Sequence, residues 1–482
     1  MFLRKALDRY KGFPVQVRAS FWSLVCGVLQ RGISVIVTPI FTRLMSTSEY
    51  GQFVTFQSWL ELLGLFLTLR LYYGVFTQGL VRRAEGDEDA YTSSLIGLMT
   101  LLEFIGLTIY LPFRAFWNSL TELTTLQTIC IFILSWASGL FAFWTSRQRI
   151  EYRYRALVGL TLAFAIAQPS CGIAAVLAYP VAKVDARVIS MACVQLLAFS
   201  WIFVMYMSRG KRPFVKKYWK HALSFNLPLV PHYLSATLLN HSDRIMINNM
   251  ISASAAGIYG LSYSLSFIMT VINQAILNTL SPWMYKRIRA GESSKIARIS
   301  YLSLGLVAMV NLVVVAVAPE VVALFAPPAY AEATSLVPPL AASVVVTFLY
   351  SLFANFEFYF ERTNLVMAAS LVGAVVNVGL NWLLLPIFGY QVAAWTTLLG
   401  YLVYVGMHYV FMRRVQIEEM DGERVYNLRI IVGILLLFAC GASALVLFYP
   451  LPVVRYLLCV VVLVVAAIKR RMFLDVWHQI RG

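Results

Sequence analysis

Fourteen apolar stretches of about 20 residues occupy almost the whole chain, and they limit its fold more than any other feature. An α-helix rises about 1.5 Å per residue, so each stretch is long enough to cross the hydrocarbon core of a bilayer. We therefore expect an all-α polytopic membrane protein with about 14 transmembrane helices. The stretches lie roughly at 18–43, 51–78, 91–113, 123–146, 156–179, 186–208, 222–250, 255–284, 297–318, 334–360, 364–387, 390–412, 428–449 and 451–468.

The composition excludes several other classes of protein. Of the 482 residues, 60% are hydrophobic and 13% are charged, which no soluble globular chain of this length would show. A β-barrel is excluded because its strands alternate apolar and polar residues, whereas the run 430–438 does not alternate. The formal net charge of +17 lies in short loops, so we expect no nucleic-acid partner. Six cysteines lack CxxC spacing and histidine companions, and we expect no metal site and no cofactor.

Lys and Arg residues are distributed unequally between alternate loops. Loops rich in these residues stay in the cytoplasm, so we expect both chain termini there and an even number of spans. The opposite loops contain only Arg114, Lys183, Arg187 and Arg455. The basic side comprises the N-terminus, Arg82-Arg83, the cluster 147–155, the segments 209–220 and 286–298, Arg362, Arg413-Arg414, Arg424, Arg429 and the tail 469–481.

A short segment occurs twice, as 45–51 after the first stretch and as 251–257 after the seventh, 206 residues later. Six stretches lie between the two copies of this segment, so the two halves would have the same orientation, as in transporters built from parallel repeats. We predict two six-helix lobes in parallel repeat, followed by a C-terminal helix pair. The predicted boundaries are 1–208 for the N-lobe, 209–221 for a basic cytoplasmic linker, 222–413 for the C-lobe, and 414–482 for the helix pair and a basic tail.

Several stretches carry an ionised residue well inside the apolar run. A charge at this depth costs at least a few kcal/mol, so it normally faces a partner or a water-filled cavity rather than lipid. For Asp243 and Arg244 the alternative to a functional role is a static ion pair. For Glu357 the alternative to ion coupling is a buried neutral carboxyl. The residues are Arg31, Glu61, Arg70, Glu103, Asp243, Arg244 and Glu357.

Polar residues form stripes in the seventh and eighth stretches. In a helix Asn240, Arg244 and Asn248 share one face, because they are four residues apart. A central cavity between the halves would collect this stripe and the one from the eighth stretch. Alternatively, these side chains only hydrogen-bond to neighbouring helices. The eighth stretch supplies Asn273, Gln274 and Asn278.

Two prolines, Pro228 and Pro231, interrupt the start of the seventh stretch. Proline removes a backbone donor and kinks a helix, so a gate beside a polar cavity is one interpretation. A tight re-entry from the basic loop into the membrane is the other.

Several short motifs occur in a fixed order along the chain. They are Pro39 with 42–44 and 49–51, the segment 224–232, Asp243-Arg244 followed by 257–259, and the segment 377–381 with Pro386, Gly389 and 393–397. In these motifs the chain resembles the polysaccharide-transporter branch (Wzx-type O-antigen and exopolysaccharide flippases) of the multidrug/oligosaccharidyl-lipid/polysaccharide (MOP) exporter superfamily, over essentially its full length. The resemblance implies two six-helix lobes around a central cavity, alternating access, and movement of an undecaprenyl-diphosphate-linked oligosaccharide across a bacterial inner membrane.

The resemblance suggests roles for the polar residues. Arginine holds phosphate oxygens by paired donors, so Arg31, Arg70 and Arg244 are candidates for binding the diphosphate headgroup. The asparagines and glutamine of the stripes would contact sugar hydroxyls. No Walker motif is present, so a proton or sodium gradient would drive transport. The carboxylates Asp243, Glu61, Glu103 and Glu357 are candidates for ion coupling, in that order. Membrane lipids and polysaccharide assembly proteins are further candidate partners.

Two other functions are compatible with a polytopic sequence of this kind. A drug/cation antiporter of the same superfamily would share the lobes, but its cavity should be acidic or aromatic. A membrane polymerase or ligase acting on the same lipid-linked glycan usually presents a large outer loop, and here the predicted outer loops are short. We therefore expect a transporter and not an enzyme.

Overall fold

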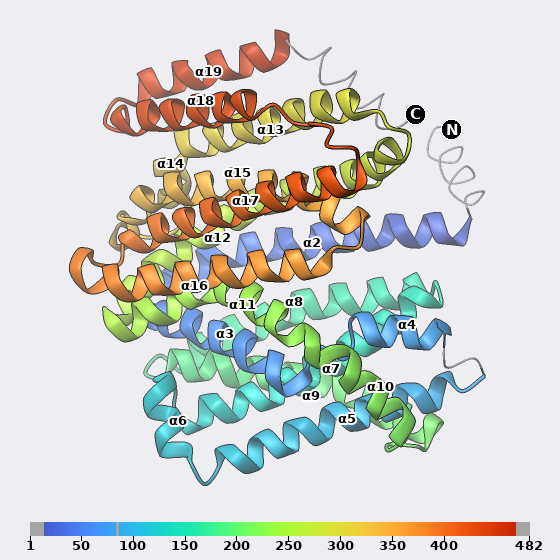
Figure 1. Ribbon diagram of the computed structural model, residues 1–482. Coiled ribbons are helices and arrows are strands. Elements are labelled where there is room, and N and C mark those ends of the chain that lie inside the picture. The colour runs from blue at the N-terminus through green and yellow to red at the C-terminus, as the bar shows by residue number, and fades with distance from the viewer. Residues whose placement is uncertain (1–13, 83–85, 469–482) are drawn as a thin grey trace, which may run out of the picture. The chain divides into compact units, whose positions relative to one another are not determined.

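The computed structural model describes residues 14–82 and 86–468, and all regular elements in this part of the chain are helices (Figure 1). Fourteen long helices overlap the fourteen apolar stretches one by one, which confirms the predicted all-α polytopic fold. They are α2 (Val15–Leu44), α3 (Thr47–Thr68), α5 (Glu88–Tyr110), α7 (Thr125–Ile150), α8 (Tyr154–Ala178), α9 (Lys183–Gly210), α11 (Val230–Met250), α12 (Ala253–Arg289), α13 (Ser293–Ala316), α15 (Ala333–Tyr359), α16 (Thr363–Phe388), α17 (Val392–Glu419), α18 (Leu428–Leu447) and α19 (Pro452–Ile468).

Within the described residues, 9 of these helices are long and apolar enough to cross a membrane by length and composition alone. Helix α19 falls short of that criterion because it has 17 residues. Helix α11 falls short because polar and charged residues such as Asp243 and Arg244 lower its hydropathy. Helix α11 therefore has a low hydropathy because it carries candidate functional residues.

Four shorter α-helices and two 3₁₀ turns lie between the long helices. The second apolar stretch, expected as one span, is divided in two, because Leu69 and Arg70 each have a φ of 47°. Non-glycine residues rarely adopt this left-handed conformation, and two in succession end a right-handed helix. The short elements are α4 (Gly74–Arg82), α6 (Arg114–Thr121), α10 (Lys216–Asn226), η1 (Leu227–Leu229), α14 (Ala318–Phe325) and η2 (Pro328–Tyr330).

The chain divides into two compact units, Met1–Leu234 and Ser235–Gly482. In unit 1, helix α9 packs against α7, α8 and α5, while α3 packs on α7 and α2 on α8. Aromatic rings hold α4 in this unit: the ring of Phe76 lies 4.8 Å from that of Phe143, edge to face. Gly79 is required there, because a Cβ atom would lie 1.9 Å from the hydroxyl of Tyr91.

In unit 2, helix α15 is central and packs against α17, α12 and α13, while α16 packs on α17. The last two helices, α18 and α19, pack on α13. Helix α19 is also tied to α14, since Arg455, which is 1% exposed, donates to the carboxylate of Glu320. The C-terminal helix pair is therefore part of the packed unit.

The division between the units falls inside α11, after Leu234. The segment expected as a linker is helical from Lys216 onward and packs on unit 1. There the indole of Trp219 donates to the carbonyl oxygen of Ser94 at 2.8 Å. The lobe boundaries at 208 and 222 stay predictions.

The repeated segments have the same local role in both halves. In the first, Ser46 caps α3: its Oγ accepts a hydrogen bond from the backbone N–H of Glu49 at 3.2 Å. In the second, Ser252 caps α12, and its Oγ accepts from the N–H of Ala255 at 3.1 Å. A serine at this position satisfies a backbone donor that the helix itself leaves unpaired. The sequence repeat therefore marks two equivalent helix starts.

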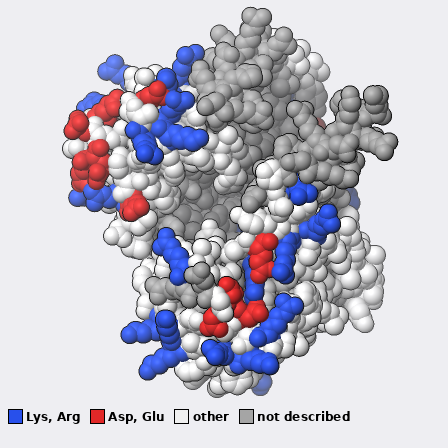
Figure 2. Space-filling model, turned by 90° about the vertical axis from the view of Figure 1, so that its right-hand side faces the viewer, with Lys and Arg blue, Asp and Glu red and all other residues white. Residues whose placement is uncertain are grey.

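The basic loops lie at helix ends, and some of their charges are paired. Arg147 contacts Asp89 at 2.5 Å, and Arg362 contacts Glu419 at 2.8 Å. Figure 2 shows a face on which Lys and Arg side chains gather, with Asp and Glu among them. Which side of the membrane these loops occupy stays a prediction; the segments 1–13 and 469–482 and Arg83 lie outside the described residues.

The two prolines lie at a change of helix type and not within one continuous helix. Pro228 is in the 3₁₀ turn η1, which joins α10 to α11, and Pro231 is in the first turn of α11. Just before this junction, the amide of Asn226 donates to the carbonyl oxygen of Leu69 at 3.0 Å in a buried position. The broken second span is therefore attached to the start of the seventh.

Replacing Asn226 by alanine should lower the stability of the protein. The change leaves the buried carbonyl of Leu69 without this donor, which costs about 1–3 kcal/mol. Thermal unfolding of the purified protein measures the effect. The control is Asn240→Ala, because Asn240 is exposed. Equal melting temperatures for the two variants would show that the attachment contributes nothing.

Candidate functional site

Asp243 is the centre of a buried polar cluster in unit 2. Its side chain is 1% exposed, and both carboxylate oxygens accept hydrogen bonds from neutral groups. Oδ2 accepts from the hydroxyls of Tyr259 at 2.5 Å and Thr397 at 2.7 Å. Oδ1 accepts from the amide of Asn381 at 2.6 Å. Four helices, α11, α12, α16 and α17, therefore each supply one side chain.

A second layer of polar groups surrounds this cluster. The hydroxyl of Thr396 contacts the side-chain oxygen of Asn381 and the carbonyl oxygen of Ala393. Thr397 lies 2.8 Å from the same carbonyl oxygen and also receives the amide of Asn377 at 3.5 Å. Because a threonine hydroxyl has only one proton, Thr397 cannot donate to Asp243 and Ala393 at once. The cluster therefore has more hydrogen-bond acceptor oxygens than donor protons.

Arg244 follows Asp243 in sequence but has different partners. Its guanidinium lies over the ring of Tyr263, 4.0 Å from the centroid, and donates to Nδ1 of His241 at 3.2 Å. In the part of the chain that the structure describes, no ion pair joins Arg244 to Asp243. The carboxyl group of Asp243 therefore has no direct cationic partner among these residues, and the static ion pair considered above is not formed.

This arrangement suits a small cation. A carboxylate, two hydroxyls, an amide oxygen and a backbone carbonyl are hard oxygen ligands of the kind that alkali and alkaline-earth ions prefer. The same carboxylate can instead take a proton. Among the described residues, no group of three or more His, Cys, Asp or Glu side chains is placed to hold a metal ion.

Glu357, the last of the coupling candidates, has a histidine partner. Its Oε1 lies 2.7 Å from Nδ1 of His408, and both side chains are 0% exposed. The rings of Tyr350 and Tyr404 pack on the imidazole, with centroids 5.5 Å and 4.5 Å away. Oε2 of Glu357 and Nε2 of His408 are buried without a hydrogen-bond partner. Glu357 and His408 thus form a buried titratable pair. Sequence reasoning did not identify His408 as the partner.

The remaining acidic candidates belong to the other compact unit. Glu103 is buried between α5 and α7, where the hydroxyl of Ser135 donates to its Oε1 at 2.5 Å. Its second oxygen is buried without a partner. Glu61 is exposed on α3. Both belong to unit 1, whereas Asp243 belongs to unit 2.

The arginines proposed for the headgroup are found in three settings. Arg70 lies at the break between α3 and α4, with its guanidinium 5.3 Å from the ring centroid of Tyr233. Arg244 is stacked on Tyr263 in unit 2. Arg31 lies in the middle of α2, but its side chain is outside the described residues.

The polar stripe residues divide into exposed and buried groups. Asn273 is buried, and its amide donates to the carbonyl oxygen of Val344 on α15 at 2.9 Å, so it joins two helices. Gln274 and Asn278 are exposed and hydrogen-bond to each other at 2.9 Å. Asn240 is exposed and accepts from the hydroxyl of Tyr263 at 2.8 Å. Asn248 donates to the side chain of Asn249.

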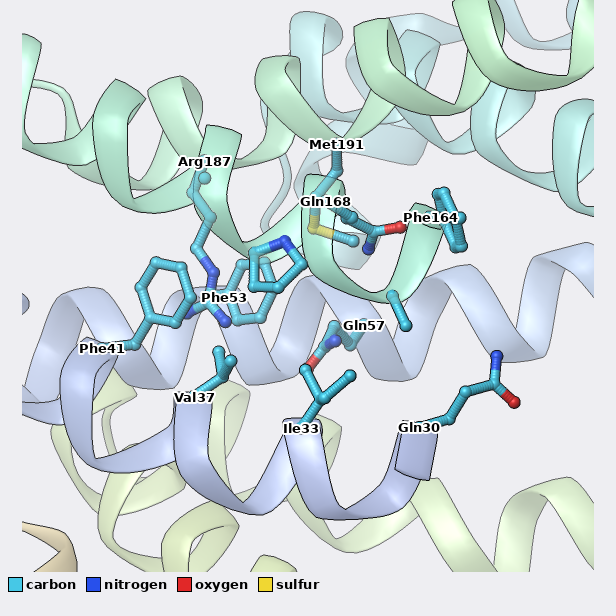
Figure 3. Close-up of a pocket in the computed structure, with 13 residues that line it drawn as sticks. Gln30, Ile33, Val37, Phe41, Phe53, Gln57, Phe164, Gln168, Arg187 and Met191 are labelled. Atoms are coloured by element: carbon cyan, nitrogen blue, oxygen red, sulfur yellow. The ribbon is translucent and has the colours of Figure 1, made fainter. Parts of the chain in front are cut away.

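Unit 1 contains a cavity of about 260 Å³ between α2, α3, α8 and α9. Arg187 extends from α9 into this space between the rings of Phe41 and Phe53, with its guanidinium carbon 3.4 Å from each centroid (Figure 3). Three glutamines line the rest of the space: Gln30, Gln57 and Gln168. Sequence reasoning counted Arg187 only as a loop charge. The signal available in the sequence was that the sixth apolar stretch, 186–208, already includes this residue.

These features define a polytopic helical membrane protein. The family model for polysaccharide biosynthesis proteins matches residues 17–288. The chain belongs to this family, as the motifs in its sequence suggested.

Two proteins of Haemophilus influenzae are similar in sequence. The Lsg locus putative protein 1 is 24% identical over 208 residues, which are 40% of this chain, and the match spans 50% of that protein's length. An uncharacterized membrane protein is 20% identical over 360 residues, covering 71% of this chain and 84% of that protein.

Solved structures of two transporters have the same fold. The lipid II flippase MurJ in an inward closed conformation has a TM-score of 0.69 at 10% identity, covering 94% of this chain and 99% of that one. An inward-facing multidrug resistance MATE family transporter of the MOP superfamily has a TM-score of 0.59 at 12% identity, covering 80% and 94%. At these identities the likeness concerns the fold alone.

Proposed function

We propose that this protein moves a lipid-linked oligosaccharide, carried on undecaprenyl diphosphate, from the inner to the outer leaflet of a bacterial inner membrane. The product would serve synthesis of a polysaccharide such as O-antigen or exopolysaccharide. Both chain termini would lie in the cytoplasm, on the side of the basic loops. The observation that carries this proposal is the match to the polysaccharide biosynthesis family over residues 17–288.

Coupling to an ion gradient is assigned to Asp243. Its carboxyl group is buried, forms no ion pair with a side chain in the described part of the chain, and accepts hydrogen bonds from side chains of α12, α16 and α17. A proton or a sodium ion bound there would change the charge at the point where four helices meet. Because these helices come from distant parts of the sequence, a change in their contacts alters the packing of the whole unit. This supports Asp243 over Glu61, which is exposed.

Headgroup binding is assigned to Arg31, Arg70 and Arg244. Arginine to alanine at position 31 or 244 should abolish surface glycan in cells that depend on this protein, while the protein still inserts. Arg244→Lys should restore little, because an ammonium group neither stacks flat on Tyr263 nor presents paired donors. Surface glycan is measured by gel and the protein by immunoblot, with Arg114→Ala at an exposed position as the control. Full glycan from both alanine variants would remove this assignment.

Reconstitution tests the function as a whole. Purified protein in liposomes should move a fluorescent lipid-diphosphate oligosaccharide to the opposite leaflet, measured as loss of protection from an added quencher. An imposed proton or sodium gradient should accelerate this movement. Transport that responds to neither gradient would remove ion coupling, and absence of transport under all conditions would remove the flippase proposal.

A drug/cation antiporter is the alternative with the same fold. The cavity in unit 1 argues against it, because Arg187 places a positive charge there and no ion pair with a carboxylate balances it among the described residues. A polymerase or ligase is disfavoured because the described loops between the long helices carry only the short elements α6, α14 and η2 on the predicted outer side.

A further inference from the structure

The Arg187 cavity contains a charge that no ion pair balances in the part of the chain that the structure describes. The guanidinium is fixed between Phe41 and Phe53, and its one polar contact among the described residues is from Nη1 to the sulfur of Met45 at 3.5 Å. A sulfur atom is a weak acceptor, so most of the five N–H donors of this arginine stay available. Its Nε and Nη2 atoms have no partner among the described residues, yet they are not buried, so they are open to the cavity.

Two carboxylates close to Phe53 and Arg187 in the sequence are engaged with other partners. Glu49 accepts from the backbone of Ser46 at 2.7 Å and lies 3.6 Å from Lys183. Asp185 accepts from the amide of Gln127 at 2.8 Å. A cation in a low-dielectric site is expensive unless an opposite charge meets it. The counter-charge is therefore expected from a ligand.

The aromatic sandwich prepares Arg187 for this role. Rings on both faces leave only the edge of the planar guanidinium free, and that edge carries the paired donors that fit a phosphate or carboxylate group. Since the ring contacts also hold the side chain in place, little conformational freedom is lost when an anion binds.

Amide groups extend the site along the cavity. Gln57 on α3 and Gln168 on α8 line it, and the side-chain oxygen of Gln168 accepts from Gln195 at 3.2 Å, which leaves its own N–H groups as donors. Gln30 lies about 16 Å from Phe41 along α2, at 1.5 Å per residue. Such amides bind hydroxyl groups, so the cavity offers an anion site at one end and sugar-type contacts beyond it.

We propose that this cavity binds an oxyanion attached to a sugar during transport. This inference rests on the proposed function and adds a site to it. Arg187 follows the loop predicted to face the outside, so the oxyanion would be held in the outer half of unit 1. Two sources share this chemistry: the phosphate of the lipid carrier and the carboxylate of an acidic sugar in the glycan.

Chemical protection of Arg187 tests the proposal without any transport. The full-length protein in lipid nanodiscs is treated with phenylglyoxal, which modifies accessible arginines, and each site is quantified by mass spectrometry. Inorganic diphosphate or glucuronate, at matched ionic strength, should slow modification of Arg187 several-fold, whereas glucose should not. Protection by diphosphate alone identifies the carrier phosphate as the source, and protection by glucuronate alone identifies an acidic sugar. Arg187 modified at the same rate under all conditions would overturn the proposal.

Variants separate this site from the rest of the protein. Arg187→Gln should weaken the diphosphate-dependent rise in melting temperature, with roughly tenfold lower affinity, because a charge-assisted pair is lost. Arg187→Lys should fall between wild type and Arg187→Gln, and it shows whether loss of binding reflects misfolding. The control is Arg114→Gln, at an exposed position outside the cavity. Unchanged diphosphate affinity in a folded Arg187→Gln would also overturn the proposal.

The two proposals fail in distinguishable ways. If Arg187 is protected by anions but liposomes show no transport, the binding site stands and the flippase function falls. If transport is normal and Arg187 is not protected, the flippase stands and this site is overturned.

Discussion

Replacing Asp243 by asparagine should abolish the acceleration of transport by an ion gradient while unit 2 stays folded. Asparagine has the same shape, so the hydrogen bond from Tyr259 or Asn381 can be kept, but it can neither take up a proton nor present a second anionic oxygen to a sodium ion. Liposome transport with and without an imposed gradient measures the effect. We expect gradient-driven transport to fall to the rate without a gradient.

The matched control for this prediction is Glu103→Gln. Glu103 is also a buried carboxyl without a cationic partner, but it has one hydroxyl donor from Ser135 and lies in unit 1. If Asp243 is the coupling residue, Glu103→Gln retains the response to the gradient. Loss of the response in Glu103→Gln, with the response intact in Asp243→Asn, would reverse the order of the two candidates.

Replacing His408 by leucine should produce the largest loss of stability of any single change considered. The substitution removes the one hydrogen-bond partner that the Glu357 side chain, which is 0% exposed, has among the described residues. Leaving such a group unpaired costs roughly 3 kcal/mol. Thermal unfolding of the purified protein should show a markedly lower melting temperature.

The double variant Glu357→Leu with His408→Leu provides the decisive comparison. When both polar partners become apolar, no buried group stays unpaired, so the double variant should be more stable than His408→Leu alone. Tyr404→Phe is the control, because it keeps the ring that packs on His408 and removes only a hydroxyl. A double variant as unstable as the single one would mean that packing of the imidazole, and not the pairing, determines the effect.

Part of the candidate site could be predicted from the sequence. Asp243 stood out because a charge inside an apolar stretch is rare, and the structure places it at 1% exposure. Its partners Tyr259, Asn381 and Thr397 were visible only as motif residues, since nothing in a one-dimensional pattern shows that they meet. His408 and Arg187 were missed for the same reason.

The amino-acid sequence by itself determined the fourteen helices, the unequal distribution of loop charges and the paired helix starts at Ser46 and Ser252. These features depend on residues close together in the chain, namely on the length of apolar runs and on local capping. Only the tertiary structure decided which polar groups meet. Thr397 is 154 residues from Asp243, and Phe41 belongs to a different helix from Arg187. Inside a membrane protein, helix packing brings such groups together, so their partners, and with them their chemistry, follow from the packed helices and not from sequence spacing.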